Sequence, residues 1–217
     1  MFKVKMIRIL DDPASSRYAK FTAPSWSDFD FSFYDAVKPA TLQDQRGLQF
    51  SDVKAGGKPW TDTEKACFYS HYNLWKECAT RQDGLPYLIL EHDALLVDTS
   101  QVFFDPRFQV VYFGQHAMEA VMYTPLTAKK LVQSTQGVLI DRGPMSYLDR
   151  FLGIYSKQSE HGVPHARLLG PSAPVRSVID PKLGTTIDHG DERSSVSYRV
   201  TRGDERNLFF VTDLSNI

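Results

Sequence analysis

A short apolar run that ends in carboxylates constrains this chain more than any other feature. Residues 87–90 read Tyr-Leu-Ile-Leu without a polar break. Such a run is typical of a strand that is covered on both faces, as in the parallel sheets of α/β proteins. Glu91, His92 and Asp93 follow it at once. The sequence therefore predicts a buried central strand with polar side chains at its carboxyl end, where ligands of open α/β sheets bind.

The order of the other predicted elements favours the same fold class. Alternating and continuous apolar patterns predict strands, and helical spacing after Pro, Thr or Gly predicts helices. We predict strands at residues 2–10, 29–35, 110–114, 120–123, 175–179 and 208–212, and helices at 13–23, from Thr127 and at 144–152. Strands that alternate with helices indicate an α/β fold with a mostly parallel central sheet flanked by helices.

The clearest predicted helix lies just before the central strand. Thr61 and Glu64 have the spacing of a capping box, which marks a helix start. An inward stripe follows at helical intervals, namely Cys67, His71, Leu74 and Cys78. The two cysteines would lie about 16 Å apart along a helix that rises 1.5 Å per residue. That separation is too large for a disulfide, so we predict two reduced thiols.

Length and composition favour one globular domain. The 217 residues, 42% hydrophobic and 24% charged, fit a single domain over residues 1–217. Within it, residues 43–60 and 154–172 are rich in polar residues, glycine and proline, and we interpret them as mobile connections. No leader-like segment and no apolar run near about 18 residues is present. We therefore expect a cytoplasmic protein, or at most one that is peripheral to a membrane.

The net charge of -1 hides an uneven distribution. Residues 21–105 hold 7 basic and 13 acidic side chains, whereas residues 129–182 hold 8 basic and 4 acidic ones. The overall balance gives no general attraction to nucleic acid or anionic membrane. The split is compatible with a cation site in the first region and anion contacts in the second. A chance distribution over solvated faces explains it equally well.

The carboxylates at the end of the central strand suit a hard cation. Side chains two residues apart in extended backbone project to the same side, so Glu91 and Asp93 would face one ion and His92 would point away. Carboxylate oxygens favour Mn²⁺ or Mg²⁺, with water and substrate phosphates completing the coordination. The alternative is a solvated turn or a helix cap without a metal.

Two motifs in register resemble glycosyltransferase family 25, which includes lipooligosaccharide and collagen galactosyltransferases. That family has a Gly-Glu-x-Gly-Cys-x-x-Ser-His-x-x-x-Trp helix before a Leu-Glu-Asp-Asp strand end. The matching positions here are Glu64, Cys67, Ser70, His71, Trp75, Glu91 and Asp93. Looser similarity, over residues 4–188 in all, involves Arg17, Tyr34-Asp35-Ala36-Val37, Met122-Tyr123 and residues 128–131.

The chain departs from the family pattern at two places. His92 stands where the family has its middle aspartate. The family's Pro-Val-Asp segment appears as Gly143-Pro144-Met145, which leaves Asp141 or Asp149 as displaced acidic substitutes. These departures concern the metal affinity and the identity of the general base.

The resemblance implies a single-domain GT-A-like nucleotide-sugar-binding fold. It also implies metal-dependent, inverting transfer from a nucleotide sugar, UDP-linked, to a hydroxyl of a cell-surface oligosaccharide. Asp93 would bind Mn²⁺ or Mg²⁺, with Glu91 as a second ligand or as the group that orients the donor sugar. His189 would be a further metal ligand that closes over the diphosphate. Asp149, or else Asp141, would be the general base. The nucleotide would contact Arg17, Asp35, Ala36, Ser70 and His71.

Each of these roles has a structural alternative. His71 can be a hydrogen-bonded core histidine, and His189 can be an exposed loop residue. Asp149 can be a solvated helix-face carboxylate beside Arg150. Arg17, whose planar fork suits phosphate or base edges, can instead form a surface ion pair with Asp11 or Asp12.

Other functions are compatible with the same residues. A viral enzyme that glycosylates hydroxymethylated bases in DNA, in the host cytoplasm, would hold phosphates with the basic side chains Arg142, Arg150, Arg167 and Arg176. A non-catalytic nucleotide-sugar-binding module would follow if His92 marks the decay of the metal site. A metal-dependent phosphohydrolase ranks last, because the chain lacks a phosphate-binding Gly-x-x-x-x-Gly-Lys loop.

Overall fold

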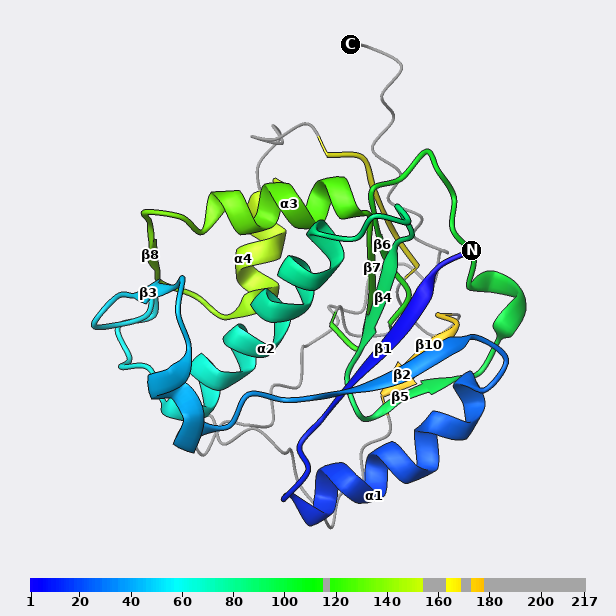
Figure 1. Ribbon diagram of the computed structural model, residues 1–217, viewed down its shortest axis with the longest axis horizontal. Coiled ribbons are helices and arrows are strands. Elements are labelled where there is room, and N and C mark those ends of the chain that lie inside the picture. Colours follow the sequence, from blue (N-terminus) through cyan, green and yellow to red (C-terminus); the bar gives the residue numbers. More distant parts are fainter. Residues whose placement is uncertain (115–117, 154–162, 169–172, 178–217) are drawn as a thin grey trace, which may run out of the picture.

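The computed structural model describes residues 1–114, 118–153, 163–168 and 173–177. Its centre is a six-stranded sheet in the order β2-β1-β4-β7-β6-β9 (Figure 1). These strands are β1 (Lys3–Arg8), β2 (Asp30–Asp35), β4 (Tyr87–Leu90), β6 (Val110–Tyr112), β7 (Ala120–Tyr123) and β9 (His165–Arg167). All run in one direction except β7, which is antiparallel to both of its neighbours. The α/β fold with a mostly parallel sheet is therefore confirmed.

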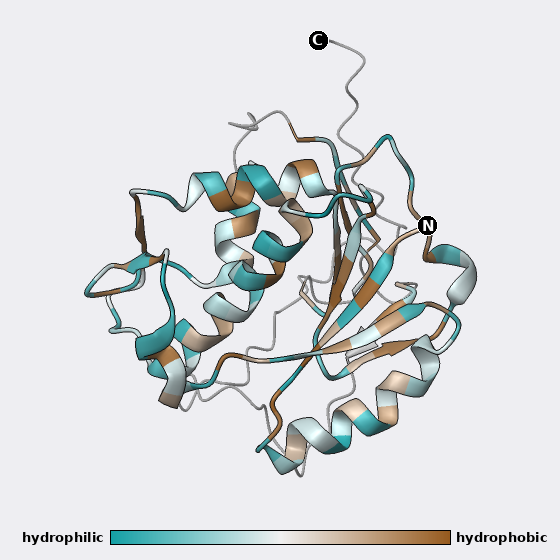
Figure 2. Ribbon diagram, in the orientation of Figure 1, coloured by the Kyte–Doolittle hydropathy of each residue, from teal (hydrophilic) through white to brown (hydrophobic). Residues whose placement is uncertain are grey.

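Helices cover both faces of this sheet. The helix α1 (Pro13–Thr22) and the 3-10 turn η1 (Ala23–Trp26) lie on one face. The helices α2 (Asp62–Ala79), α3 (Pro125–Ser134) and α4 (Pro144–Phe151) lie on the other. Alternate residues of β4 serve the two faces, since Leu88 and Leu90 pack with Trp26 whereas Tyr87 and Ile89 pack under α2. Figure 2 shows the resulting concentration of hydrophobic residues in the central strands.

Local sequence signals explain where the helices begin. Asp12 caps α1 by accepting a hydrogen bond from the Ala14 amide at 2.9 Å, just before Pro13. Thr61 and Glu64 form the predicted capping box at the start of α2. The third helix begins at Pro125 instead of Thr127, because Thr124 is its cap and accepts from the Thr127 amide.

The crossover connections predict a ligand site at the carboxyl ends of the central strands. The β1-α1-β2 connection crosses one face, and the β2-α2-β4 connection crosses the other. The connection from β1 to β2 and the connection from β2 to β4 therefore run in opposite directions along the sheet, and the carboxyl ends of β1 and β4 flank a topological switch point. Crevices at such points are where open α/β sheets bind ligands.

The smaller elements lie outside the central sheet. The strands β3 (Gln49–Phe50) and β8 (Leu139–Ile140) pair in parallel, and β5 (Ala94–Leu96) pairs antiparallel with β10 (Val175–Ser177). The remaining 3-10 turns are η2 (Pro39–Asp44) and η3 (Thr99–Gln101). Residues 43–60 thus contain β3, and the Lys54 ammonium pairs with the Glu64 carboxylate of α2 at 2.5 Å.

Several predictions concern the rest of the chain. The strand at residues 208–212, most of the connection at 154–172 and His189 lie outside the described residues. The assignment of residues 1–217 to one domain therefore stays a prediction. No helix in the described part of the chain is long and apolar enough to span a membrane.

Candidate active site

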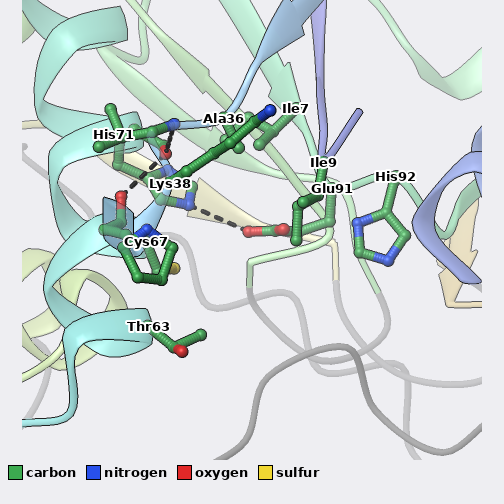
Figure 3. Close-up of a pocket in the computed structure, with 13 residues that line it drawn as sticks. Ile7, Ile9, Ala36, Lys38, Thr63, Cys67, His71, Glu91 and His92 are labelled. Carbon is green, nitrogen blue, oxygen red and sulfur yellow. Dashed lines mark hydrogen bonds and ion pairs between the residues drawn. The ribbon is translucent and has the colours of Figure 1, made fainter. Parts of the chain in front are cut away.

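A pocket lies at the switch point, where β1, β2 and β4 end (Figure 3). Its volume is about 540 Å³, counted with the part that opens to solvent. The end of β1, the loops after the three strands and the first half of α2 supply the lining residues. They are Ile7, Ile9, Ala36, Val37, Lys38, Pro39, Thr63, Ala66, Cys67, Ser70, His71, Glu91 and His92. Mostly apolar walls with a few polar groups are typical of small-molecule sites.

An ion pair between Glu91 and His71 lies in the wall of the pocket. The His71 Nε2 atom lies 3.0 Å from Glu91 Oε1, and Figure 3 shows the two side chains pointing toward each other. His71 is buried, whereas 21% of the Glu91 side chain stays exposed toward the pocket. Burial alone would raise the pKa of Glu91, but the hydrogen bond and charge of His71, with the charge of His92, lower it. Glu91 is therefore an ionised carboxylate that faces the pocket.

Ser70 fixes the opposite wall. Its Oγ atom accepts a hydrogen bond from the Val37 amide at 3.0 Å and donates one to the Ala66 carbonyl at 2.9 Å. The Ala36 amide donates to the Arg8 carbonyl at 2.8 Å. These bonds join the segment after β2 to α2 and to β1. Asp35 does not line the pocket, and its carboxylate pairs with Arg8 at 2.8 Å.

The backbone turns directly after Glu91. The Ala94 amide donates to the Glu91 carbonyl at 3.1 Å, so His92 and Asp93 are the central residues of a turn. The expectation that extended backbone carries Glu91 and Asp93 to the same side is therefore wrong. The His92 ring packs against Tyr18 of α1 with a centroid distance of 5.7 Å, on the side of Glu91 away from His71 (Figure 3). Asp93 is half-buried and does not line the pocket.

Cys67 lines the pocket as a protonated thiol. Burial, followed by the charges of Glu91 and Glu64, raises its pKa well above the usual range. Burial likewise raises the pKa of Cys78 to about 12. Both cysteines are free, as predicted. A thiol that keeps its proton is a poor nucleophile, so Cys67 serves as an apolar wall residue.

Most of the pocket, all but Ile7 and Ile9, falls within a region that matches a known family. The sequence model of glycosyltransferase family 25 (LPS biosynthesis protein) matches residues 16–142, more than half of the chain. This chain belongs to glycosyltransferase family 25. The match contains the strand end at Glu91 and the whole of α2, so the resemblance inferred from these two motifs is confirmed.

Curated relatives share part of the chain. It is 38% identical over 80 residues to the lipooligosaccharide biosynthesis protein lic2B of Haemophilus influenzae, covering 36% of this chain and 29% of that protein. It is 29% identical over 150 residues to the lacto-N-neotetraose biosynthesis glycosyltransferase LgtB of Neisseria meningitidis serogroup A, covering 58% and 53%. The chain thus spans about half or less of the length of these relatives.

A solved structure shows a weaker likeness. It is that of a glycosyltransferase involved in the glycosylation of the major capsid of PBCV-1. The sequence identity is 10% and the TM-score is 0.45, over 81% of this chain and 92% of that one.

The two candidate bases lie away from the pocket. Asp149 lies beyond the family match and is buried, so the alternative of a solvated helix-face carboxylate is wrong. Its Oδ1 atom accepts a hydrogen bond from the Tyr112 hydroxyl at 3.2 Å and lies 3.5 Å from the Arg167 guanidinium. Asp141 pairs with Arg142 at 2.8 Å, and this hydrogen bond lowers its pKa. Neither aspartate lines the pocket.

Arg17 is exposed on α1 and does not line the pocket. The ion pair suggested for it is not seen at either aspartate, because the Asp11 carboxylate pairs with Lys38 and Asp12 caps α1. Lys38 was not among the predicted site residues, although it directly follows the Asp-Ala-Val segment. Its position after the carboxyl end of β2, like that of Glu91 after β4, is the signal in the sequence that points to it.

The acidic side chains near the pocket could hold a metal ion only if the substrate supplied part of its coordination. Among the described residues, no group of three or more His, Cys, Asp or Glu side chains could hold a metal ion. Mg²⁺ and Mn²⁺ nevertheless bind to one or two carboxylates when substrate phosphates and water supply the other ligands. Glu91, which lines the pocket, and Asp93, which lies within the turn after β4, would supply these two carboxylates.

Proposed function

We propose that this chain is a glycosyltransferase that moves a sugar from a UDP-linked donor to a hydroxyl of a cell-surface oligosaccharide. The observation that carries the proposal is the pocket at the switch point, with an ionised Glu91 held by His71 inside the family match. The names of lic2B and LgtB, which refer to lipooligosaccharide and lacto-N-neotetraose biosynthesis, support this acceptor class.

The lining residues suit the nucleoside part of such a donor. Ile7, Ile9 and Val37 offer apolar surface to a flat ring, and the Glu91 carboxylate accepts hydrogen bonds from hydroxyl groups. Ala36, Ser70 and His71 shape the wall beside them, as expected for nucleotide-side residues. Arg17 and Asp35, which were also predicted to contact the nucleotide, do not line the pocket and would have to reach it from outside.

The proposed reaction is a single displacement that inverts the configuration at the sugar carbon. Mn²⁺ or Mg²⁺, when bound, would supply the positive charge that stabilises the departing diphosphate. Asp93 would hold this ion, with Glu91 bound directly or through water. The acceptor hydroxyl must lose its proton as it attacks, and Asp149 or Asp141 is the proposed base. His189 would close over the diphosphate.

The contacts of the basic side chains bear on DNA as an alternative acceptor. Arg142 pairs with Asp141, and Arg167 pairs with the buried Asp149. Of these two, Arg167 is held by a buried carboxylate and is not available to a DNA phosphate, whereas the Arg142 pair is more exposed. The oligosaccharide acceptor therefore remains the proposal. If it is right, the protein should show no salt-sensitive binding to DNA.

The test is a screen of nucleotide sugars for release of the free nucleotide, with Mn²⁺ and with a chelator. We expect UDP release that requires the metal and that rises when an oligosaccharide acceptor is added. Asp93→Asn should abolish transfer without unfolding the protein, because it removes a metal-binding charge at almost constant volume. Asp28→Asn, at an exposed loop position, is the matched control.

Two outcomes would contradict this assignment. Full transfer activity of Asp93→Asn in the presence of Mn²⁺ would remove Asp93 from the metal site. Nucleotide-sugar binding by the unmodified protein without hydrolysis or transfer would instead favour the non-catalytic binding module.

A further inference from the structure

One cation lies in the wall of the pocket without a role in the chemistry above. Lys38 follows β2 and is the only lysine or arginine among the thirteen described lining residues. Figure 3 shows its extended side chain among them. Its backbone is fixed, since the Thr41 amide donates to the Lys38 carbonyl at 3.0 Å. Lys38 thus has an anchored backbone and a side chain that reaches solvent at the pocket.

The ion pair that Lys38 makes is easily exchanged. Its ammonium group contacts the carboxylate of Asp11, in the loop after β1. The Asp11 side chain is 77% exposed and that of Lys38 is 34% exposed. Water stabilises both charges when such a pair separates, so exposed ion pairs contribute little to stability. A ligand with more negative charge than one carboxylate can therefore take the place of Asp11.

The position of this pair matches the anionic part of a nucleotide. Asp11 and Lys38 follow neighbouring parallel strands at the switch point, whereas the apolar wall continues inward with Ile7 and Val37. If the nucleoside part of a nucleotide lies in the apolar part of the pocket, its phosphates would lie near the more exposed Lys38 and Asp11. Lys38 is the lysine among the described lining residues, so it is the side chain of this wall that can pair with a phosphate group.

We propose that Lys38 binds the diphosphate of the nucleotide-sugar donor and leaves Asp11 when the donor enters. This inference rests on the proposed function, because it takes a nucleoside diphosphate as the ligand. The alternative is that the Lys38–Asp11 pair only joins the loops after β1 and β2. The two roles predict different effects of Asp11→Asn. If Lys38 binds the diphosphate, this substitution removes a competitor for Lys38. If the pair only joins the two loops, it removes a structural contact.

The test compares each nucleoside diphosphate with its nucleoside by calorimetry, with and without Mn²⁺. The pairs are UDP and uridine, GDP and guanosine, and CDP and cytidine. Lys38→Gln should weaken binding of the preferred diphosphate about tenfold or more, because a charge-assisted contact is lost, and leave its nucleoside unchanged. Lys38→Arg should keep most of the affinity, and Asp11→Asn should not lower it.

Lys3→Gln is the matched control. Lys3 pairs with Asp30 at 3.3 Å, and its side chain is 35% exposed, but it lies at the amino ends of the same two strands. We expect unchanged binding of both ligands by this variant.

The remaining outcomes decide against the inference. Equal diphosphate affinity of Lys38→Gln and the unmodified protein would overturn the role of Lys38 and leave the proposed function intact. Equal losses in Lys38→Gln and Asp11→Asn, for nucleoside and diphosphate alike, would show that the pair is a structural tie. If the unmodified protein binds none of the three diphosphates, both the inference and the nucleotide-sugar proposal fail.

Discussion

The buried His71 determines the chemical state of the strand-end carboxylate. Nε2 lies at hydrogen-bond distance from Glu91, whereas the buried Nδ1 has no hydrogen-bond partner among the described residues. Because the carboxylate can only accept, Nε2 carries the proton of this hydrogen bond and donates to Glu91. A carboxylate in an apolar wall needs such a donor to stay ionised.

His71→Phe tests this assignment at the level of one side chain. The substitution keeps a ring beside Trp75, whose centroid lies 6.4 Å from that of His71, but removes the donor to Glu91. We expect a loss of about 1.5–3 kcal/mol in the free energy of unfolding, because a hydrogen bond to a charged group disappears. Urea unfolding measures it.

The double variant with Glu91→Gln is the control for that experiment. If the two side chains interact as described, the double variant loses less stability than the sum of the two single losses. Additive losses would mean that the contact between His71 and Glu91 contributes nothing to stability.

Asp149 can be tested separately as a base and as a packing residue. Its carboxylate is buried against Tyr112 and Arg167, so Asp149→Asn leaves the Arg167 charge without its partner. We expect a loss of about 3 kcal/mol in the free energy of unfolding, as for other broken buried pairs. A general base would instead show a large fall in kcat at unchanged stability, so measuring both quantities distinguishes the two roles.

At the scale of elements, α2 supplies more lining residues of the pocket than any other element. Five lining residues lie in its first ten positions, namely Thr63, Ala66, Cys67, Ser70 and His71. The capping box sets where this helix begins, with hydrogen bonds from the Glu64 amide to Thr61 Oγ1 at 3.2 Å and from the Thr61 amide to Glu64 at 3.0 Å. The first turn of α2 therefore positions one side of the site.

Thr61→Ala should shorten or loosen this first turn. We expect a loss of about 1 kcal/mol in the free energy of unfolding, the usual cost of losing a capping hydroxyl. Because the pocket wall moves with the turn, the Kd for the nucleotide should rise as well. Thr61→Ser keeps the hydroxyl and should restore both quantities. A Thr61→Ser variant as unstable as Thr61→Ala would contradict the capping explanation.

The elements that the sequence predicts are those with local signals. The bounds of α2 and β4 follow from a capping box, a helical stripe and a continuous apolar run within a few residues. The short strands β3, β5, β8 and β9 lack such signals. β5 has only three residues, and its partner β10 lies about 80 positions later, so only tertiary pairing defines it.

The residues of the site were easier to predict than their contacts. Both His71 and Glu91 stand out in the sequence, but their pairing depends on how α2 crosses the sheet. Asp93 was expected to continue the strand, yet the chain turns there and enters β5, which pairs with β10 outside the central sheet. Such changes of direction have no signature in the run 91–93 itself.

At the scale of the whole molecule, the two crossovers on opposite faces leave the pocket at the carboxyl ends of the strands and away from their amino ends. The pocket lies at the carboxyl edge, while Lys3, Asp30 and Tyr87 lie in register at the amino edge of the same strands. A ligand at the switch point contacts only the carboxyl ends of these strands. It should therefore protect backbone amides there more than at the amino ends.

Hydrogen exchange with and without the preferred nucleoside diphosphate tests this expectation. We expect slower amide exchange at Ala36, Val37 and Lys38 and in the first half of α2, and no change at the amino edge of β1 and β2. Binding also stabilises the molecule against global unfolding, which slows the exchange of the most protected core amides everywhere. The comparison therefore concerns amides that exchange through local opening. Protection that is equal at both edges would place the ligand elsewhere, since a pocket at the carboxyl ends cannot contact the amino ends of the same strands.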